Sequence, residues 1–296
     1  MQINSKDKII DYFTQGNKKD LKIGVENEKF LFKKTENKRV NYSEILNIFK
    51  FFIEKFKWEK ILENNHLVGL KNKGKSITLE PGNQIELSGA QFKNIHEVCA
   101  ESYKFQSELN EICESLDLYT LAVGYDPISK LEEVSDNPKQ RYKIMLNEMP
   151  KNGKYSLDMM YLTSGTQINI DYLSEFDFKK KFKVLNYLCP LTIALFANSS
   201  IKEKKFSGYL SFRSRVWQET ARGGLPEIFL EEMDFEKYTD FLINVPMLFY
   251  KKDDLYFSAK DKTFKDFMDG NIEERKKRLP LVEDLELHLS TNIYRE

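Results

Sequence analysis

Apolar residues recur at helical spacing in several stretches of the chain, and each such stretch predicts a helix. Ile45, Phe49 and Phe52 lie on one stripe of the first stretch, as expected for a helix that buries one face. Asn94 precedes the second stretch and can cap the helix that follows. The predicted helices cover residues 43–58, 94–116 and 176–198, the last interrupted by Pro190, with shorter helices at 235–243 and 263–269.

Other stretches alternate apolar and polar residues, which is typical of strands with one buried side. The predicted strands are residues 21–33, a hairpin within 66–88 whose second arm breaks at Pro81 and Gly82, and residues 119–127, 163–172 and 246–251. Helices and strands mix without the regular alternation of a doubly wound sheet, so the pattern predicts an α+β fold with a largely antiparallel sheet. The chain contains no internal repeat and no Ser/Gly-rich linker, which indicates one domain spanning residues 1–296.

Three predicted strands carry acids or amides on the side opposite their apolar residues. Because side chains at i and i+2 of a strand share a side, Glu26 and Glu28 lie together. In the same way Glu80 and Glu86 oppose the apolar residues of their segment, although the turn at Pro81 can change the side on which Glu80 lies. Gln167, Asn169 and Asp171 form the third polar row, opposed by Ile168 and Ile170. Such polar sides often face water, but neighbouring acids repel each other, and a multivalent cation would relieve the repulsion.

Charge and composition narrow the function classes. The chain has 46 basic and 46 acidic residues, and this balance argues against a general nucleic-acid-binding protein. Three cysteines without paired spacing fit a reduced protein, and Cys99 and Cys113 are expected in the core. The N-terminus lacks the apolar run of a signal peptide, and the longest apolar stretch, residues 188–197, is too short to cross a bilayer. We therefore expect a cytoplasmic protein with no membrane partner.

Oxygen ligands without nearby histidine or cysteine are those that magnesium or manganese prefers. Magnesium commonly binds one or two carboxylates together with substrate phosphates, so the acid rows indicate a nucleotide site. The sequence contains no P-loop, no protein-kinase catalytic loop and no glycine-rich dinucleotide motif.

A cluster of arginines supplies the opposite charge. Arg213, Arg215 and Arg222 fall within ten positions, with Trp217 beside them, and if this stretch is a strand the first two arginines and Trp217 share one side. The planar guanidinium group suits carboxylate and phosphate oxygens, although such arginines can also form surface ion pairs. Acid rows and an arginine segment together indicate phosphoryl transfer. The three histidines, His66, His96 and His288, have no partner motif and are expected to be structural.

Several segments resemble those of a known family. "ITLEPGNQIELSGAQFKNIHEVCAE" is similar to the signature of plant-type and proteobacterial glutamate–cysteine ligases, which reads roughly LEPGGQFELSGAP followed by LHQTCAE. Further blocks follow in the family's order from about residue 20 to 290: "IGVENEKFLF", "RYKIMLNEMP", "LDMMYLTSGTQINIDY", "ALFANSS", "GYLSFRSRVW" and "VPMLF". Each block is weakly diagnostic alone, but the ordered set is specific.

The resemblance implies a glutamine-synthetase-like fold, with an antiparallel sheet curved into a funnel and helices outside. It implies ATP-dependent ligation of the glutamate side-chain carboxylate to the amino group of cysteine through an acyl phosphate, giving γ-glutamylcysteine, the first step of glutathione synthesis. The cofactor would be Mg²⁺, roughly two or three ions as in other phosphoryl-transfer sites, with ATP as co-substrate. The partners would be the small molecules glutamate, cysteine and ATP, and the protein would be a monomer or homodimer.

The resemblance also implies roles for individual residues. The metal-binding carboxylates of the family correspond to Glu26, Glu28, Glu80 and Glu86. Arg213 matches the arginine that holds glutamate and the transferring phosphoryl group, and Arg222 matches a second catalytic arginine. The other residues with implied substrate-binding positions are Trp217, Gln167, Met145 and Met149, with Met160 in a neighbouring segment.

The sequence also departs from the family pattern. Glu148 stands where the family usually has tyrosine, and the loop "QETARGGLP" is shorter and less acidic than its counterpart. The chain stops at "LHLSTNIYRE", where the family continues into a segment with another metal-binding glutamate and a second phosphate-facing arginine. We therefore expect a chain truncated at its C-terminus. Two alternatives stay open: a related carboxylate–amine ligase with another amine acceptor, and a non-catalytic nucleotide- or glutamate-binding remnant.

Overall fold

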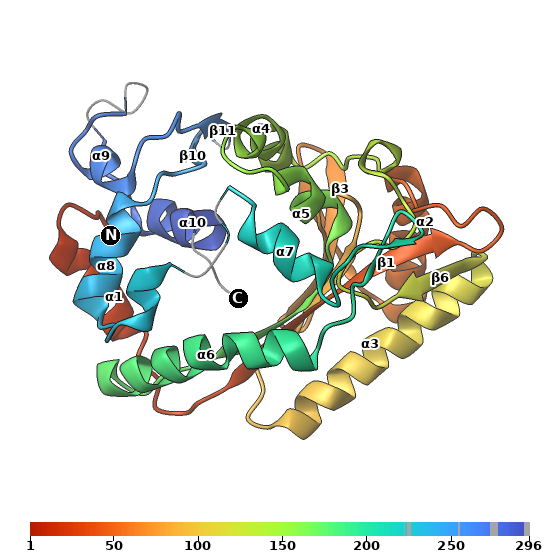
Figure 1. The fold of residues 1–296 in the computed structure, drawn as a ribbon, viewed down its shortest axis with the longest axis horizontal. Helices are drawn as coiled ribbons and strands as arrows, with labels where there is room; N and C mark the ends of the chain where they lie inside the picture. The colour runs from red at the N-terminus through yellow and green to blue at the C-terminus, as the bar shows by residue number, and fades with distance from the viewer. Residues whose placement is uncertain (222, 224–225, 254, 273–277, 293–296) are drawn as a thin grey trace.

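The fold combines helices with an antiparallel sheet, as expected for the α+β class (Figure 1). The computed structural model describes residues 1–296 except 222, 224–225, 254, 273–277 and 293–296. No helix among these described residues is long and apolar enough to cross a membrane.

A seven-stranded sheet forms the centre of the fold, with the strand order β2-β3-β4-β5-β1-β6 and with β7 also paired to β1. Every pairing in it is antiparallel. The strands are β1 (Ile23–Lys33), β2 (Glu59–Glu63), β3 (His66–Asn72), β4 (Lys75–Leu79), β5 (Ile85–Ser88), β6 (Leu118–Leu121) and β7 (Thr166–Ile170). The hairpin expected within residues 66–88 is thus three strands, because the break at Pro81 and Gly82 is a true turn between β4 and β5.

Strand β1 organises the sheet because it pairs with three others along its length. Its residues 26–29 pair with β5, residues 23–27 with β7, and residues 30–33 with β6. Polar residues near the start of β1 therefore meet residues of both β5 and β7, whereas its end, from Phe30 onward, is buried.

Helices α2 (Tyr42–Phe56) and α3 (Ile95–Ser115) cover one side of the sheet (Figure 1). Asn94 caps α3 as predicted, because its side chain accepts from the Glu97 amide. In α2 the side chain of Asn41 does the same by accepting from the Glu44 amide, a cap that the sequence analysis did not predict. Their apolar stripes pack against apolar residues of the sheet to form the largest core. The strand residues of this core are Leu31, Leu70, Ile77, Leu79, Ile85, Leu87 and Leu118.

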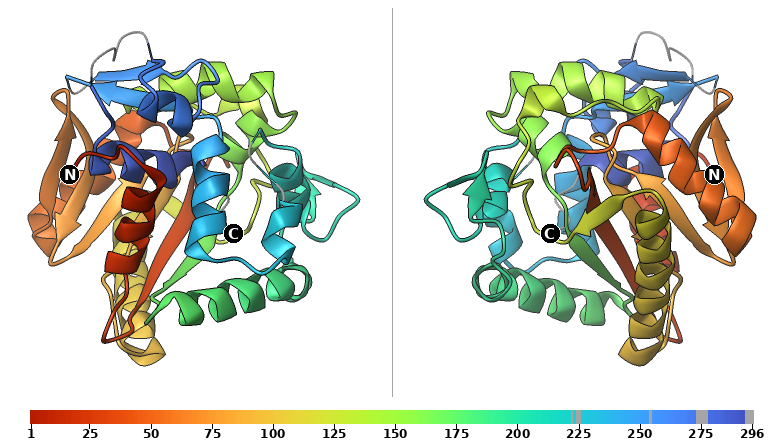
Figure 2. Two further views of the ribbon diagram at one scale, coloured as in Figure 1. Left: turned by 90° about the vertical axis from the view of Figure 1, so that its left-hand side faces the viewer. Right: turned by 90° about the vertical axis from the view of Figure 1, so that its right-hand side faces the viewer.

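The opposite side of the sheet faces α4 (Gln140–Glu148), α5 (Ser156–Leu162) and α7 (Phe212–Gln218) (Figure 1). A second core lies among these helices, and a third joins the N-terminal helix to elements late in the chain (Figure 2). The remaining elements are α1 (Lys6–Gln15), α6 (Glu175–Leu195), α8 (Phe235–Asn244), α9 (Phe264–Met268), α10 (Val282–Asn292), the hairpins β8 (Ile201–Lys202) with β9 (Lys205–Phe206) and β10 (Phe249–Lys252) with β11 (Leu255–Ser258), and 3₁₀ turns at Leu131–Glu133, Met149–Lys151 and Glu227–Leu230.

Several sequence expectations are wrong in detail. Pro190 does not end α6, which runs from Glu175 to Leu195 with the proline inside it. The fixed φ of proline is in the helical range, although its ring removes one backbone hydrogen bond and crowds the preceding turn. Cys113 is buried as expected, but Cys99 is exposed on α3. On β7 the apolar side is not covered, and Ile168 and Ile170 are 62% and 46% exposed.

Segment 212–218 is a helix, not a strand. Ser211 caps it by accepting a hydrogen bond from the amide of Ser214. Phe212 and Val216 are both buried, and their separation of four residues is the helical period that the alternating interpretation overlooked.

A buried ion pair joins the sheet to the helices that face its polar side. The Arg39 and Asp126 side chains are 1% and 0% exposed, with 3.1 Å between Nη1 and Oδ2. Arg39 also donates to the carbonyl oxygens of Tyr161 and Gly82, and the other Asp126 oxygen accepts from the amides of Ile128 and Ser129. Removing one partner of such a pair leaves an uncompensated buried charge.

We predict that Arg39→Met lowers the free energy of unfolding by about 3–5 kcal/mol, because the Asp126 carboxylate loses its counter-charge. Urea unfolding followed by circular dichroism measures the change. The double variant Arg39→Met/Asp126→Asn should recover part of this loss, since the amide oxygen still accepts from Ile128 and Ser129 while the charge is gone. A double variant that is less stable than Arg39→Met alone would contradict this account.

Candidate active site on the polar face of the sheet

The start of β1 and its two neighbours form a polar face, which we define by the side chains of Glu26, Glu28, Glu86, Gln167 and Asn169. The register places Glu28 directly opposite Glu86 of β5, and Glu26 opposite both Ser88 of β5 and Gln167 of β7. Like charges directly opposite one another destabilise a sheet. The expected grouping of these acids is thus confirmed for Glu28 and Glu86, with Glu26 and Gln167 beside them.

Glu80 reaches this face from the turn between β4 and β5. The Glu80 amide donates to the Gln84 carbonyl (3.0 Å), and the Asn83 amide donates to the Glu80 carbonyl (2.9 Å). Asn83 adopts a left-handed φ of 62°, a conformation that asparagine tolerates better than most residues. A Cβ atom on Gly82 would lie 2.7 Å from the Tyr161 carbonyl oxygen, so only glycine fits there without displacing the backbone.

Contacts from other segments also hold this turn. Arg39 donates to the Gly82 carbonyl, and the Asn137 side chain donates to the carbonyls of Glu80 (2.8 Å) and Pro81 (3.2 Å). Gln84 donates to the carbonyls of Met160 and Thr163. Hydrogen bonds between side chains and backbone carbonyls therefore fix the turn that carries Glu80.

The acids of the site have perturbed protonation equilibria. Burial, followed by the charges of Glu80 and Glu86, raises the pKa of Glu28 well above its usual range. Burial, followed by the charge of Glu86, raises the pKa of Glu80 to about 7. Glu86 accepts hydrogen bonds from the hydroxyls of Thr78 (2.7 Å) and Ser88 (3.2 Å), and Glu28 accepts one from the Gly165 amide (2.7 Å). A bound cation would relieve the electrostatic repulsion within such a group of acids.

Arg213 on α7 opposes these acids. Its guanidinium group packs so closely on Gly165 that a Cβ atom there would lie 2.9 Å from Nη2, and its charge lowers the pKa of Glu28. It also lies over the ring of Trp217, with 5.4 Å from Cζ to the ring centroid. Trp217 follows Arg213 by one helical turn and so shares its side, whereas Arg215 pairs with Glu219 and does not.

Trp217 carries a buried donor that the described residues do not satisfy. Its indole Nε1 is buried and has no hydrogen-bond partner among them. Because such a group is costly to leave unpaired, it is a candidate ligand contact. Arg222, the second predicted catalytic arginine, lies outside the described residues.

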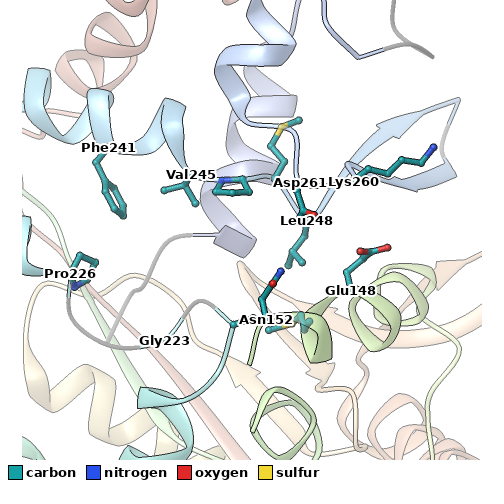
Figure 3. Close-up of a pocket in the computed structure, with 13 residues that line it drawn as sticks. Glu148, Asn152, Gly223, Pro226, Phe241, Val245, Leu248, Lys260 and Asp261 are labelled. Carbon is teal, nitrogen blue, oxygen red and sulfur yellow. The ribbon is translucent and has the colours of Figure 1, made fainter. Parts of the chain in front are cut away.

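The predicted methionines belong to the second core or pack against it. Met149 and Met160 are 3% and 2% exposed within the second core, and Met145 packs against the same core. Met149 also lines a cavity of about 500 Å³ between the end of α4, the end of α8 and the segment around Leu248. In Figure 3, Glu148 and Asn152 lie on one side of this cavity, and Phe241 and Val245 on the other. The substrate roles of the methionines stay predictions.

Sequence reasoning missed three residues that the structure brings to the site. Lys139, Arg141 and Tyr142 lie at the start of α4, beside Glu80. The charges of Lys139 and Arg141 lower the pKa of Glu80, and burial in turn lowers the pKa of Lys139 to about 8. The segment "PKQRY" offered a signal, because two basic residues at a helix N-terminus oppose the helix dipole.

The chemical type of the available donor atoms suits a hard divalent cation. The available atoms are carboxylate and amide oxygens, as magnesium prefers. Among the described residues, no three Asp, Glu, His or Cys side chains are gathered closely enough to form a ready metal cluster. Magnesium commonly takes one or two carboxylates and completes its coordination with water and phosphate, so the opposed pair of Glu28 and Glu86 is sufficient in number.

Comparisons with known proteins identify the family. A profile of "Glutamate-cysteine ligase family 2" matches residues 22–294. The chain is 38% identical over 292 residues to "Glutamate--cysteine ligase A, chloroplastic" of Oryza sativa subsp. japonica, covering 97% of this chain and 59% of that protein. It is 37% identical over 292 residues to "Glutamate--cysteine ligase, chloroplastic" of Nicotiana tabacum, covering 97% and 56% respectively. The chain thus spans less than two thirds of the length of these relatives, and it belongs to glutamate-cysteine ligase family 2.

Proposed function

We propose that this chain is an ATP-dependent ligase that joins the side-chain carboxylate of glutamate to the amino group of cysteine through an acyl phosphate, giving γ-glutamylcysteine. One observation carries the proposal most directly. Glu28 and Glu86 lie directly opposite each other on one face of the sheet, and Glu80 and Arg213 are near enough for their charges to act on Glu28. Acids able to hold cations and an arginine able to hold an oxyanion are the groups that phosphoryl transfer needs.

We further infer that the sheet belongs to the glutamine-synthetase-like type, in which a curved antiparallel sheet lines a funnel and helices cover its outside. The helices α2 and α3 on the apolar side of the sheet and the acids on its other side support this inference. Residues 1–296 would form a single catalytic domain.

Glu26, Glu28, Glu80 and Glu86 would hold Mg²⁺, which when bound supplies charge neutralisation for the phosphates of ATP. Arg213 would bind the side-chain carboxylate of glutamate. An oxygen of this carboxylate would take the terminal phosphoryl group of ATP, which gives the acyl phosphate and releases ADP. The Arg213 guanidinium is kept in place by Gly165 below it and by the ring of Trp217. A fixed cation of this kind stabilises charge that develops on transferring oxygens at little reorganisation cost.

The cysteine amine would then attack the acyl carbon, forming the amide bond and releasing phosphate. The indole N–H of Trp217, which has no hydrogen-bond partner among the described residues, would donate to a substrate oxygen beside Arg213. Gln167, which lies opposite Glu26 on β7, would contact the same cluster from the other side. An acyl phosphate must be shielded from water, and the helices α5 and α7 in front of the sheet would supply part of that shield.

The raised pKa of Glu80 makes stability depend on pH in a specific direction. Between its ordinary value of 4.5 and about 7, the folded protein holds the Glu80 proton while the unfolded chain loses it. We therefore expect the free energy of unfolding in EDTA to fall between pH 5 and pH 8, with a Glu80 contribution of up to about 3 kcal/mol. Thermal unfolding at the two pH values measures the change, and Mg²⁺ should restore stability at pH 8.

Glu80→Gln is the matched variant for this measurement. It should lose less stability between pH 5 and pH 8 than the original protein and should gain less from Mg²⁺. If the variant and the original protein respond equally to pH and to Mg²⁺, Glu80 is not the group responsible.

The ligase activity itself is tested with the purified chain, Mg²⁺, ATP, glutamate and cysteine, by following γ-glutamylcysteine and phosphate release. We expect Glu80→Gln and Arg213→Ala each to reduce the rate by a factor of about 100 or more, as removal of one oriented charged group does in other enzymes. Arg215→Ala is the matched control, because Arg215 lies two positions away and pairs with Glu219. It should keep nearly the original rate.

The outcomes separate the alternatives. Phosphate release that depends on a different amine would support a related carboxylate–amine ligase. Binding of MgATP without any product would support a non-catalytic remnant. Original rates in both Glu80→Gln and Arg213→Ala would refute the assignment of the site.

A further inference from the structure

Arg213 of α7 lies against two segments of the chain that pair with each other through an isolated antiparallel bridge between Tyr125 and Thr163. Each segment places a glycine against the arginine, namely Gly124 on one segment and Gly165 on the other. Neither glycine has a left-handed φ, so the backbone conformation alone would accept another residue at both positions. The close approach of Arg213 is the constraint that favours glycine there.

Arg213 leaves little room for a side chain at either glycine. A Cβ atom on Gly124 would lie 3.1 Å from the Arg213 Cδ and 3.4 Å from its Cβ, whereas carbon atoms in ordinary contact are about 3.5–4.0 Å apart. A Cβ atom on Gly165 would lie 2.9 Å from Nη2 and 3.4 Å from Cζ. Gly124 thus lies against the aliphatic base of the arginine, and Gly165 lies against its charged end.

Ser199 holds the backbone of the same arginine. Its Oγ accepts from the Arg213 amide (3.1 Å), and its carbonyl accepts from the Phe212 amide (3.0 Å). Both amides belong to the first turn of α7, where backbone donors have no acceptor inside the helix. Ser199 is only 3% exposed and follows α6, so a residue from another part of the fold fixes the point at which α7 begins.

Asn198 connects these two supports. Its Oδ1 accepts from the Gly124 amide (3.0 Å), and a Cβ atom on Gly124 would lie 2.9 Å from the same oxygen. At the neighbouring positions, the ring of Tyr125 packs edge-on against that of Phe212, with 4.9 Å between the ring centroids. The arginine side chain is therefore enclosed between a glycine and a helix start, which Asn198 and Ser199 hold in fixed positions.

Gly165 relates the arginine to the carboxylates. Its amide donates to the Glu28 Oε2 (2.7 Å), and its carbonyl accepts from the Glu28 amide (3.0 Å). One residue thus lies against both the guanidinium of Arg213 and the carboxylate of Glu28. A displacement of Arg213 from its supports would therefore change its distance from the acids of the polar face.

We propose that Gly124, Asn198 and Ser199 are positioning residues, which hold the Arg213 guanidinium at the place where it receives an oxyanion of the substrate. They act through Arg213 and do not themselves touch the substrate. The choice of oxyanion rests on the proposed function, in which it is the side-chain carboxylate of glutamate. A charged group that is fixed before the ligand arrives stabilises developing charge at little reorganisation cost, and a misplacement of about 1 Å can cost a factor of about 100 in rate.

The fluorescence emission of Trp217 reports the position of Arg213 without any ligand or activity. The Arg213 Cζ lies 5.4 Å from the centroid of the Trp217 ring. Trp58 is the other tryptophan of the chain, so Trp58→Phe leaves Trp217 as the single indole. In this background we expect Gly124→Ala and Ser199→Ala each to shift the emission towards that of Arg213→Ala, because the first displaces the arginine side chain and the second releases its backbone.

A double variant separates positioning from a general structural role. In Arg213→Ala, the methyl group of Gly124→Ala no longer meets the arginine Cδ, so Gly124→Ala should cause little further shift in emission. An equal shift with and without the Arg213 side chain would mean that Gly124 acts on the fold, and it would overturn the proposal. Ser200→Ala is the matched control for Ser199→Ala and should leave the emission unchanged, because Ser200 accepts from the Ser207 amide with its backbone carbonyl, which alanine keeps.

Calorimetry with glutamate tests the choice of oxyanion, in the presence of Mg²⁺ and a non-hydrolysable ATP analogue. We expect Gly124→Ala to raise the Kd for glutamate by about 10- to 100-fold and Ser200→Ala to leave it unchanged. A shifted emission with an unchanged Kd for glutamate would refute the assignment of the glutamate carboxylate to Arg213.

Circular dichroism and thermal unfolding verify that each variant is folded. If Gly124→Ala is not folded, Asn198→Ala takes its place, since it removes the acceptor that holds Gly124. If Trp58→Phe is not folded, the variants are compared in the two-tryptophan chain, where the contribution of Trp58 is common to all of them. Unchanged Trp217 emission in the folded variants of Gly124 and Ser199 overturns the proposal.

Failure of this proposal can be told apart from failure of the ligase function. A chain that makes no γ-glutamylcysteine but shows the emission shift, and loses it in the Arg213→Ala background, retains the positioning without the proposed reaction. A chain that makes the product, with emission and the KM for glutamate both unchanged in Gly124→Ala, retains the reaction without the positioning.

Discussion

Glu28 of β1 and Glu86 of β5 face each other directly across two hydrogen-bonded strands, and most features of the site follow from this repulsion. Both cannot be ionised and buried at the same time without positive charge nearby. Arg213 supplies positive charge beside Glu28, and Lys139 and Arg141 supply it beside Glu80. Because pairing with β5 and β7 fixes the register of β1, the acids cannot separate to relieve the strain. Bound cations would relieve this repulsion.

Hydrogen bonds from other segments hold the turn between β4 and β5 in place despite the repulsion among the carboxylates. Glu80 lies in the five-residue connection between β4 and β5, whose carbonyl oxygens accept from Arg39 and Asn137. Tyr142 and Lys139 donate to the preceding carbonyl of Leu79. Arg39 is itself neutralised by the buried Asp126. The Arg39–Asp126 ion pair and Glu80, a candidate metal-binding carboxylate, are thus linked through one backbone turn. Substitution of Arg39 should therefore change the position of Glu80 as well as the stability of the fold.

The sequence predicted the parts of this site that depend on local periodicity. Strand alternation placed Glu28 and Glu86 on one side because their apolar neighbours Leu31, Ile85 and Leu87 are truly buried. The same rule gave the wrong burial for β7, where tertiary packing leaves Ile168 and Ile170 exposed. It also obscured α7, a short helix whose two buried residues fit either pattern in isolation. Lys139 and Arg141 could not be placed, since their nearness to Glu80 arises from residues about 60 positions apart in sequence and from no local pattern.

Three local rules are broken on this one face, and their coincidence is informative. Like charges lie opposite each other in a sheet, cations occupy a helix N-terminus, and the indole donor of Trp217 is buried with no partner in the part of the chain that the structure describes. Each of these costs stability alone, and elsewhere in the chain the corresponding rules are obeyed, as in the caps of α2 and α3. Local conflicts of this kind are concentrated at functional sites, where the residues must bind a ligand as well as stabilise the fold. A set of divalent cations together with a phosphate or carboxylate would relieve all three conflicts at once.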